Sequence, residues 1–230
     1  MKNLLTRGGI EFLAVLLGIS ASLWIENNRT ERELQSQLNQ SLKALKLSII
    51  EDKKAMNRFL DNHEALMSHF DFIQDKDSVK ESSNQRLKKA FEQTTIPRSI
   101  NLDYTIFSSM ESSGLIYKIK DDQLRNKILK LYQSRYNSLI EIFDYDLENV
   151  KKMDDVIINN FIISKKSVMW NLDYDNPSTR TDITENQIFQ NYMAGNKSTR
   201  IIMVSFIRNL ISPVDDLISD LEKWESTHPQ

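Results

Sequence analysis

An apolar run at residues 8–25, GGIEFLAVLLGISASLWI, constrains this chain more than any other feature, and a glutamate, Glu11, lies inside it. An α-helix of about 18 residues, at 1.5 Å per residue, reaches roughly 27 Å, close to the ~30 Å hydrocarbon core of a bilayer. Trp24 lies near the far end, where an indole ring favours the headgroup layer, and the residues beyond it are polar. We therefore predict one transmembrane helix at residues 8–26, preceded by a short tail, residues 1–7.

A cleaved signal peptide is the competing interpretation of this run, because Ser20, Ala21 and Ser22 are small enough for a cleavage site. Glu11 interrupts the apolar stretch that a signal peptide needs, and the run is long for one, which favours the anchor. The chain contains no cysteine, so lipoprotein anchoring and disulfides are excluded.

The charges that flank the predicted span bear on its orientation. Lys2 and Arg7 precede it, and Arg29 and Arg32 follow it, so the positive-inside rule tips only slightly toward a cytoplasmic N-terminus. Short N-terminal anchors usually leave the bulk of a chain outside. We expect a single-pass protein of a bacterial inner membrane with its helical domain in the periplasm.

Ala14, Gly18 and Ser22 recur every four residues, and Glu11 joins the same helix face one turn earlier. Small residues at this spacing let two helix backbones approach closely in lipid. An ionisable group inside a span is by default a functional hypothesis. These four residues form the predicted transmembrane association face, with the lipid bilayer and either a second copy or another membrane protein as partners.

A second interpretation of Glu11 stays open. Glu11 lies only a turn or two inside the span, and Arg7, four residues earlier, can pair with it on the same helix. In that case Glu11 belongs to an ion pair at the membrane interface, with Arg7 and Trp24 as the interface anchors. A proton relay is disfavoured, because the apolar run at residues 8–25 contains no second ionisable residue.

Few breakers interrupt the rest of the sequence, which contains five glycines and four prolines in all and so favours helices over an all-β fold. We predict an all-α protein with a polar stalk at residues 27–37 and a helical bundle at residues 38–230. An apolar stripe at bundle spacing supports packing against other helices rather than a strict coiled coil. It comprises Leu38, Leu42, Leu45, Ile49, Met56, Leu60, Met67 and Phe70.

Breakers and caps locate the first helices of this bundle. No strong breaker occurs between Glu26 and about Ile73, so a single long helix is expected there. Residues 75–83 are predicted as a loop and residues 85–93 as a short helix. A further helix is expected from near Asp103 to Ser113, with Gly114 as its C-terminal cap.

The downstream helices are predicted in the same way. Asp121 or Asp122 can cap the longest of them. Residues 165–181 are expected to be irregular, and Asp182 and Glu185 have the spacing of a capping box for the next helix.

Pro213 lies inside the last predicted helical region, which begins near Ser198. The run from Ser212 to Asp216 resembles a fresh helix start, with a cap, a proline at the first position and acids in the first turn. We therefore expect a kink or a break at Pro213.

No pattern of residues points to catalysis, a cofactor or a metal. His63 and His69 are six residues apart, which predicts different helix faces, and neither has the glutamate of a di-iron motif three residues before it. The loop that starts at Asp173 resembles a calcium loop, but Ser178 and Thr184 replace its glycine and its bidentate glutamate. The net charge of −2 gives no general attraction to nucleic acid. We predict no catalytic, cofactor-binding or metal-binding residues and no nucleic-acid partner.

Two short stretches carry a resemblance to a family. The N-terminal one runs from Ile10 to Gly18 and on to Trp24 and Glu26; the second comprises Ser113, Gly114, Ile119, Lys120, Asp121, Leu124 and Tyr132. In both, the chain resembles uncharacterised bacterial single-span membrane proteins with a helical domain of unknown function. The resemblance covers the anchor and roughly residues 104–136. It implies a membrane-anchored helical protein and no particular activity.

Two functional hypotheses follow. The first is a non-enzymatic, membrane-anchored interaction or sensing module that acts through oligomerisation or lateral contact with a membrane partner. The alternative is an accessory subunit of a transporter, motor or defence complex, which contacts the partner's transmembrane helices through Glu11 and the small-residue face.

Overall fold

The computed structural model describes residues 2–164 and 172–228, and their side chains from residue 15 onward except that of Pro177. Within these residues the regular secondary structure is helical, apart from one isolated β-bridge between Ile163 and Leu172. The prediction of an all-α protein with a helical bundle is confirmed.

Most of the helices follow one another closely, and the longer connections are residues 96–104 and 161–176. In chain order they are α1 (Lys2–Asp61), α2 (His63–Gln74), α3 (Lys76–Glu81), α4 (Asn84–Thr95), α5 (Thr105–Ser112), α6 (Asp122–Lys130), α7 (Asn137–Asn160), α8 (Pro177–Glu185) and α9 (Gln187–Thr227). A 3₁₀ turn, η1 (Leu115–Lys118), follows α5, and a π-helical segment, η2 (Leu131–Tyr136), joins α6 to α7.

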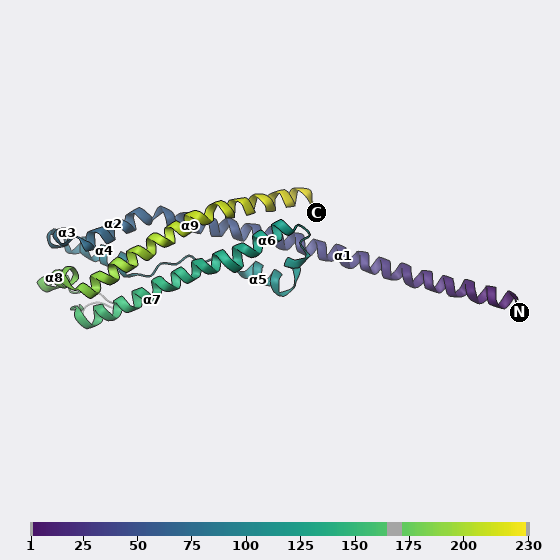
Figure 1. Ribbon diagram of the computed structural model, residues 1–230, viewed down its shortest axis with the longest axis horizontal. Coiled ribbons are helices and arrows are strands. Elements are labelled where there is room, and N and C mark those ends of the chain that lie inside the picture. The colour runs from purple at the N-terminus through teal and green to yellow at the C-terminus, as the bar shows by residue number, and fades with distance from the viewer. Residues whose placement is uncertain (1, 165–171, 229–230) are drawn as a thin grey trace.

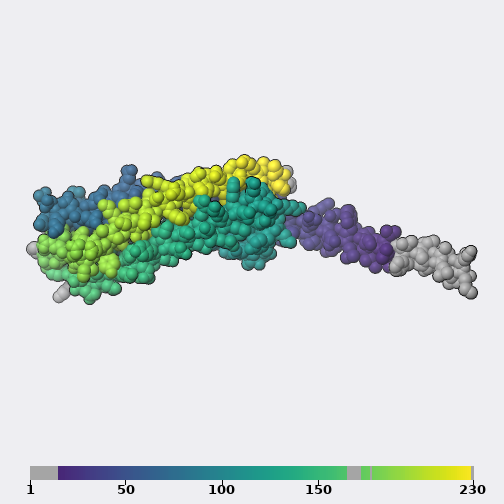
Figure 2. Space-filling view, viewed as in Figure 1, coloured from purple at the N-terminus to yellow at the C-terminus, as the bar shows by residue number. Residues whose placement is uncertain are grey.

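Three long helices form the body of the bundle. The second part of α1 packs along α9, and α9 packs along α7, while the first part of α1 projects beyond the bundle (Figure 1). Helices α5 and α6 lie at the end where α1 leaves, and α2, α3, α4 and α8 gather at the opposite end. Figure 2 shows the same arrangement as an elongated body from which α1 emerges.

The first buried side chain of α1 is Leu38, and the described side chains before it are exposed or half-buried. From there the predicted stripe faces the interior, because Leu42, Leu45, Ile49 and Met56 are at most 1 % exposed. Burial of such side chains supplies most of the free energy that holds a helix of this length in a bundle.

Two apolar cores lie along the bundle axis. The proximal core, near the point where α1 leaves the bundle, includes Leu42, Ile49, Met56, Phe107, Leu139, Phe143, Met203, Ile207 and Leu217. The distal core includes Phe70, Ile73, Leu87, Phe91, Val150, Met153, Ile183, Phe189 and Met193. Helices α7 and α9 each contribute to both cores, so each must cross the boundary between them.

The prediction of one helix from Glu26 to Ile73 was wrong, because α1 ends at Asp61 and α2 begins at His63. The Asn62 side chain donates its amide hydrogen to the Arg58 carbonyl over 2.8 Å. Asparagine competes in this way with the backbone for helical acceptors, which is why it favours helix ends. The break lies where the chain passes from the proximal to the distal core.

Residues 75–83, predicted as a loop, contain the short helix α3. The Asp75 carboxylate accepts from the amide of Asp77 and from the hydroxyl of Ser78, over 3.2 and 2.8 Å. The side chain therefore satisfies donors that a helix N-terminus leaves free. Ser83 caps α4, which extends beyond the predicted 85–93 at both ends.

Several predicted helix ends are confirmed. Gly114 follows α5 with φ of 74°, the left-handed conformation that glycine adopts at low cost. Asp121 caps α6 by accepting from the amides of Gln123 and Leu124. Residues 165–171 of the predicted irregular segment lie outside the described residues. Helix α8 begins at Pro177 with Asn176 as its cap, so the predicted capping box at Asp182 and Glu185 was wrong.

A kink or a break was expected at Pro213, and the break is absent, because α9 continues through it from Gln187 to Thr227. A proline removes one backbone hydrogen bond from a helix interior. Here Leu210, Val214 and Leu217, on both sides of the proline, are all at most 1 % exposed in the proximal core. Packing on both sides therefore keeps the helix continuous across a residue that would end it in isolation.

Candidate functional site

The predicted transmembrane association face is only partly described. Three of the predicted site residues lie outside the described side chains: Arg7, Glu11 and Ala14. Ser22 donates its hydroxyl hydrogen to the Gly18 carbonyl over 2.9 Å, one turn earlier on the same face. A Cβ built on Gly18 would meet no atom within 4 Å, so the bundle itself leaves this face open.

The described part of the apolar run is uncovered. Its large side chains are 48–67 % exposed, and they are Val15, Leu16, Leu17, Ile19, Leu23, Trp24 and Ile25. Contiguous exposed apolar surface of this kind is typical of contact with a membrane or another protein. Searched over the residues that the structure describes, no helix offers a stretch long and apolar enough to cross a membrane. Residues 8–14 of the run lie outside the described side chains.

A polar layer separates the two apolar cores of the bundle. On α7, Asp146 lies between Phe143 of the proximal core and Val150 of the distal core. On α9, Arg200 lies between Met203 and Met193 in the same way, and both charged side chains have an exposed fraction of zero. The break between α1 and α2 lies at the same boundary. Buried charges in a layer of this kind need complete pairing, because an unpaired one costs several kcal/mol.

Asp146 and Arg200 form the centre of this layer. Arg200 Nε donates to Asp146 Oδ1 over 3.1 Å, and its two Nη atoms donate to the carbonyls of Gln93 and Ile96 over 3.3 and 2.7 Å. The backbone amide of Arg98 donates to Asp146 Oδ2 over 2.9 Å. Both carboxylate oxygens and all three guanidinium nitrogens are therefore used. The guanidinium also lies 5.0 Å from the centre of the Phe70 ring, a cation–π arrangement.

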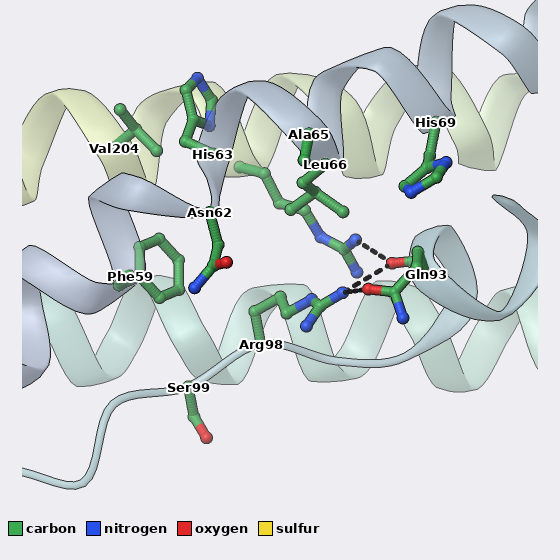
Figure 3. A pocket seen from close by; sticks show the side chains of 11 residues that line it. Phe59, Asn62, His63, Ala65, Leu66, His69, Gln93, Arg98, Ser99 and Val204 are labelled. Carbon is green, nitrogen blue, oxygen red and sulfur yellow. Dashed lines mark hydrogen bonds between the residues drawn. The ribbon is translucent and has the colours of Figure 1, made fainter. Parts of the chain in front are cut away.

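Arg98 places a second guanidinium beside the first. Its Nη2 donates to the carbonyl and the side-chain oxygen of Gln93, over 3.1 and 2.7 Å, so both arginines share the Gln93 carbonyl (Figure 3). Arg98 Nε is buried and has no hydrogen-bond partner. Burial lowers the pKa of Arg98, and the nearby Asp146 carboxylate opposes this effect. Arg98 thus lines a cavity with its side chain while its buried Nε lacks an acceptor.

That cavity is a pocket of about 350 Å³ between α2, the end of α4, the segment after it and α9. Phe59, Leu66 and Val204 supply apolar walls, and Arg98 and Gln93 supply polar ones. In Figure 3, Phe59 and Val204 lie toward one end and Gln93 toward the other, with the two guanidinium groups between α2 and the segment that carries Arg98. The volume is in the range of pockets that hold small organic molecules.

His63 and His69 both line this pocket, in the first and second turns of α2. Their six-residue spacing corresponds to about 120° around a helix, yet both side chains reach the same pocket. Burial lowers the pKa of His63, and the Arg208 charge lowers it further. Burial also lowers the pKa of His69, as do the charges of Lys89, Arg98 and Arg86. Both imidazoles are consequently neutral near pH 7, in a positive local field.

A second polar cluster lies within the proximal core. Asp52 is 3 % exposed and accepts from the Asp103 amide over 3.0 Å through Oδ1, while its Oδ2 has no partner. Burial raises the pKa of Asp52 to about 6. The hydroxyls of Tyr132 and Tyr136 are buried in the same core without partners. The Asp103 carboxylate already has hydrogen-bond partners, because it accepts from the Ser48 hydroxyl and from the Thr105 amide.

Neither cluster has the arrangement of a metal site. Among the described residues, no group of histidine, aspartate and glutamate side chains is placed to hold a metal ion. The pocket beside Arg98 also differs from the Asp52 cluster in charge, since none of the described residues that line it is an acid. The chemistry that the pocket offers is recognition of an anion.

Arg98, Asp146 and Arg200 were not among the predicted site residues. For Asp146 and Arg200, the spacing of the apolar residues around them in the sequence could have indicated a buried position. Asp146 lies three residues after Phe143 and four before Val150, and Arg200 lies three before Met203 and seven before Ile207, so each charge occupies a core position. Arg98 follows a proline outside any helix, and nothing local distinguishes it from a surface arginine.

No protein-family model, curated protein sequence or solved structure matches this chain. The candidate site therefore rests on its own geometry.

Proposed function

We propose that this protein is a non-enzymatic, membrane-anchored helical module that binds a ligand or partner outside the bilayer. The signal from this binding passes to other proteins within the membrane, through oligomerisation or through contact with another membrane protein. The observation that carries the proposal is the continuity of α1, a single helix from Lys2 to Asp61. The exposed apolar residues 15–25 lie on the same helix as Leu42, Ile49 and Met56 of the proximal core.

The end of α1 supports a role in sensing. The helix stops at Asp61, beside the polar layer. Phe59 and Asn62 line the pocket beside Arg98, which we call the basic pocket. A change in the occupancy of the pocket would therefore act on the end of the helix that reaches the anchor. The anchor itself is proposed as a transmembrane helix at residues 8–26 in a bacterial inner membrane, with the bundle in the periplasm.

Crosslinking of the full-length protein in native membranes tests this function. Gly18→Ile should abolish the crosslinked dimer or partner complex, because it fills the face on which two backbones would meet. A Cβ at Gly18 meets no atom of the chain, so the substitution does not disturb the bundle. Leu16→Ile, on the opposite side of the same helix, is the matched control and should leave the crosslink unchanged.

A strictly monomeric wild-type protein that captures no membrane partner would overturn the proposal. Capture of a different membrane protein, lost on Glu11→Gln, would instead favour the accessory-subunit alternative. The side of the membrane can be measured independently: single cysteines introduced at exposed bundle positions should react with an impermeant reagent added from the periplasmic side. The natural chain has no cysteine to interfere.

A further inference from the structure

The charges around the basic pocket do not balance. Two guanidinium groups, those of Arg98 and Arg200, lie against one buried carboxylate, that of Asp146. The Asp146 carboxylate makes its side-chain ion pair with Arg200 and only a backbone bond with Arg98. His63 and His69 add no charge near neutral pH, as their lowered pKa values show. Arg98 therefore has no ion-pair partner of its own, and the charges of Arg208, Lys89 and Arg86 add to the positive field at the two histidines, so the pocket favours an anion.

The donors of Arg98 have the geometry for such an anion. Gln93 takes both hydrogens of Nη2 and Nε is buried, so Nη1, which makes no hydrogen bond with the described residues, is the donor left for a ligand. A charge-assisted hydrogen bond from a guanidinium to an anion is roughly twice as strong as one between neutral groups. A carboxylate accepts such a bond through either of its oxygens. The polar wall at Arg98 therefore fits a carboxylate group.

The other residues that line the pocket indicate the chemistry of the rest of the ligand. Phe59, Leu66 and Val204 are apolar, and Phe59 and Val204 lie at the end of the pocket away from Gln93 (Figure 3). A volume of about 350 Å³ exceeds what a single carboxylate needs. A short hydrocarbon chain can fill this part of the pocket and gain the free energy of apolar burial.

We propose that this pocket binds a small monocarboxylate, with its carboxylate on Arg98 and its hydrocarbon chain against Phe59, Leu66 and Val204. The ligand would bridge the end of α1 and α2, the segment that carries Arg98, and α9. This assigns a ligand class to the sensing module and rests on the proposed function for its biological consequence, although binding itself can be measured separately.

Titration calorimetry on the full-length protein in detergent tests the assignment with butanoate and its neutral isostere butanamide. Butanoate should bind at least about tenfold more tightly, because only it can neutralise Arg98. Inorganic phosphate and acetate should both bind more weakly than butanoate, because neither has a hydrocarbon chain to fill the apolar part of the pocket. Equal affinity for butanoate and butanamide, or tighter binding of phosphate, would overturn the proposal.

Variants locate the site. Arg98→Gln keeps the backbone amide that bonds Asp146, and it should reduce butanoate affinity about tenfold or more while leaving butanamide unchanged. Arg98→Lys should retain part of the preference for the anion. Lys151→Gln removes an exposed cation outside the pocket and serves as the matched control, with wild-type affinity expected. Unchanged butanoate binding in folded Arg98→Gln would overturn the assignment, and the isostere comparison on the wild type needs no variant.

A crosslinking assay with and without butanoate separates this proposal from the proposed function. Butanoate binding supports the site even when the crosslinks do not change, and in that case the sensing function fails. Crosslinks that depend on Gly18 without any butanoate binding support the membrane module and overturn the ligand class.

Discussion

Asp146 and Asp52 are both buried carboxylates, but their surroundings give them opposite effects on stability. Asp146 has a guanidinium on one oxygen and a backbone amide on the other. Asp52 has one backbone amide, and its second oxygen is left without a partner among buried tyrosines. A paired buried charge is costly to break, whereas an unpaired one is costly to keep.

Replacing Asp146 with alanine should lower the free energy of unfolding by about 3–5 kcal/mol, because it leaves the fully buried Arg200 without its counter-charge. Urea unfolding followed by circular dichroism measures the change. Asp144→Ala, on an exposed position of the same helix, should change stability by less than about 0.5 kcal/mol. A loss below about 1 kcal/mol for Asp146→Ala would show that the pair does not hold the layer together.

The raised pKa of Asp52 predicts that the protein loses stability as the pH rises, whereas a carboxylate in an ordinary salt bridge loses its stabilising effect as the pH falls. Its pKa in the folded protein, about 6, exceeds the usual 3.8, so the folded state binds the proton more tightly than the unfolded chain does. The stability contributed by the protonated carboxyl is complete below about pH 4 and is lost as the pH rises through 6, by about 3 kcal/mol for a shift of this size.

Asp52→Asn keeps an acceptor for the Asp103 amide and carries no charge. The variant should therefore be more stable than the wild type at pH 7.5, and the difference should disappear near pH 4. Unfolding free energies of both proteins across this range provide the measurement, and other titrating groups cancel in the difference. A constant difference at all pH values would contradict the raised pKa.

At the scale of elements, α9 shows how packing overrides local signals. It contains Gly195 and Pro213, either of which favours a helix end, yet it runs unbroken for 41 residues. Helix α1 shows the reverse, because it ends at Asp61, just before Asn62, a residue that the pattern of breakers did not single out. The two cores account for both outcomes: Pro213 adjoins Leu210 and Val214 of the proximal core, and Asn62 lies between the two cores.

Pro213→Ala should raise the free energy of unfolding by about 1–2 kcal/mol. Alanine restores a backbone donor for the Asn209 carbonyl and favours the helix, and the lost rigidity of the unfolded chain offsets only part of this gain. Thermal unfolding would show the increase as a higher Tm. A lower Tm would mean that α9 needs the local geometry of the proline to pack against α1.

At the scale of the whole molecule, the bundle and the projecting part of α1 are energetically separate. The described side chains from Val15 to Asn27 are exposed, and the first buried side chain is Leu38. Two cores with a polar layer between them make up the rest. The proximal core is continuous with the projecting helix, and the basic pocket lies at the other end of that core, beside the layer.

A chain that begins at Thr30 should therefore keep the stability of the bundle within about 0.5 kcal/mol, because the described side chains that it lacks, at residues 15–29, are exposed or half-buried. It should also remain in the aqueous phase during a detergent partition in which the full-length protein enters the detergent phase. Urea unfolding and the partition assay test the two parts separately. Loss of cooperative unfolding in the shorter chain would show that the projecting segment contributes to the fold.

Much of the fold could be predicted because its signals are local. The stripe that begins at Leu38, the left-handed Gly114 and the cap at Asp121 depend on residues within a few positions of each other. The candidate site could not be predicted in this way. The hydrogen bonds that build it join Asp146 to Arg98 and to Arg200, 48 and 54 residues apart along the chain.

The sequence by itself determined the all-α class and the apolar run at residues 8–25, because the spacing of apolar side chains and caps acts over single turns of helix. Only the tertiary structure decided that the bundle has two cores, that the helix breaks at Asn62 and not at Pro213, and that Arg98 meets Arg200. These features depend on which distant segments pack together. How deeply a helix break or a charged side chain is buried by that packing then sets its free-energy cost.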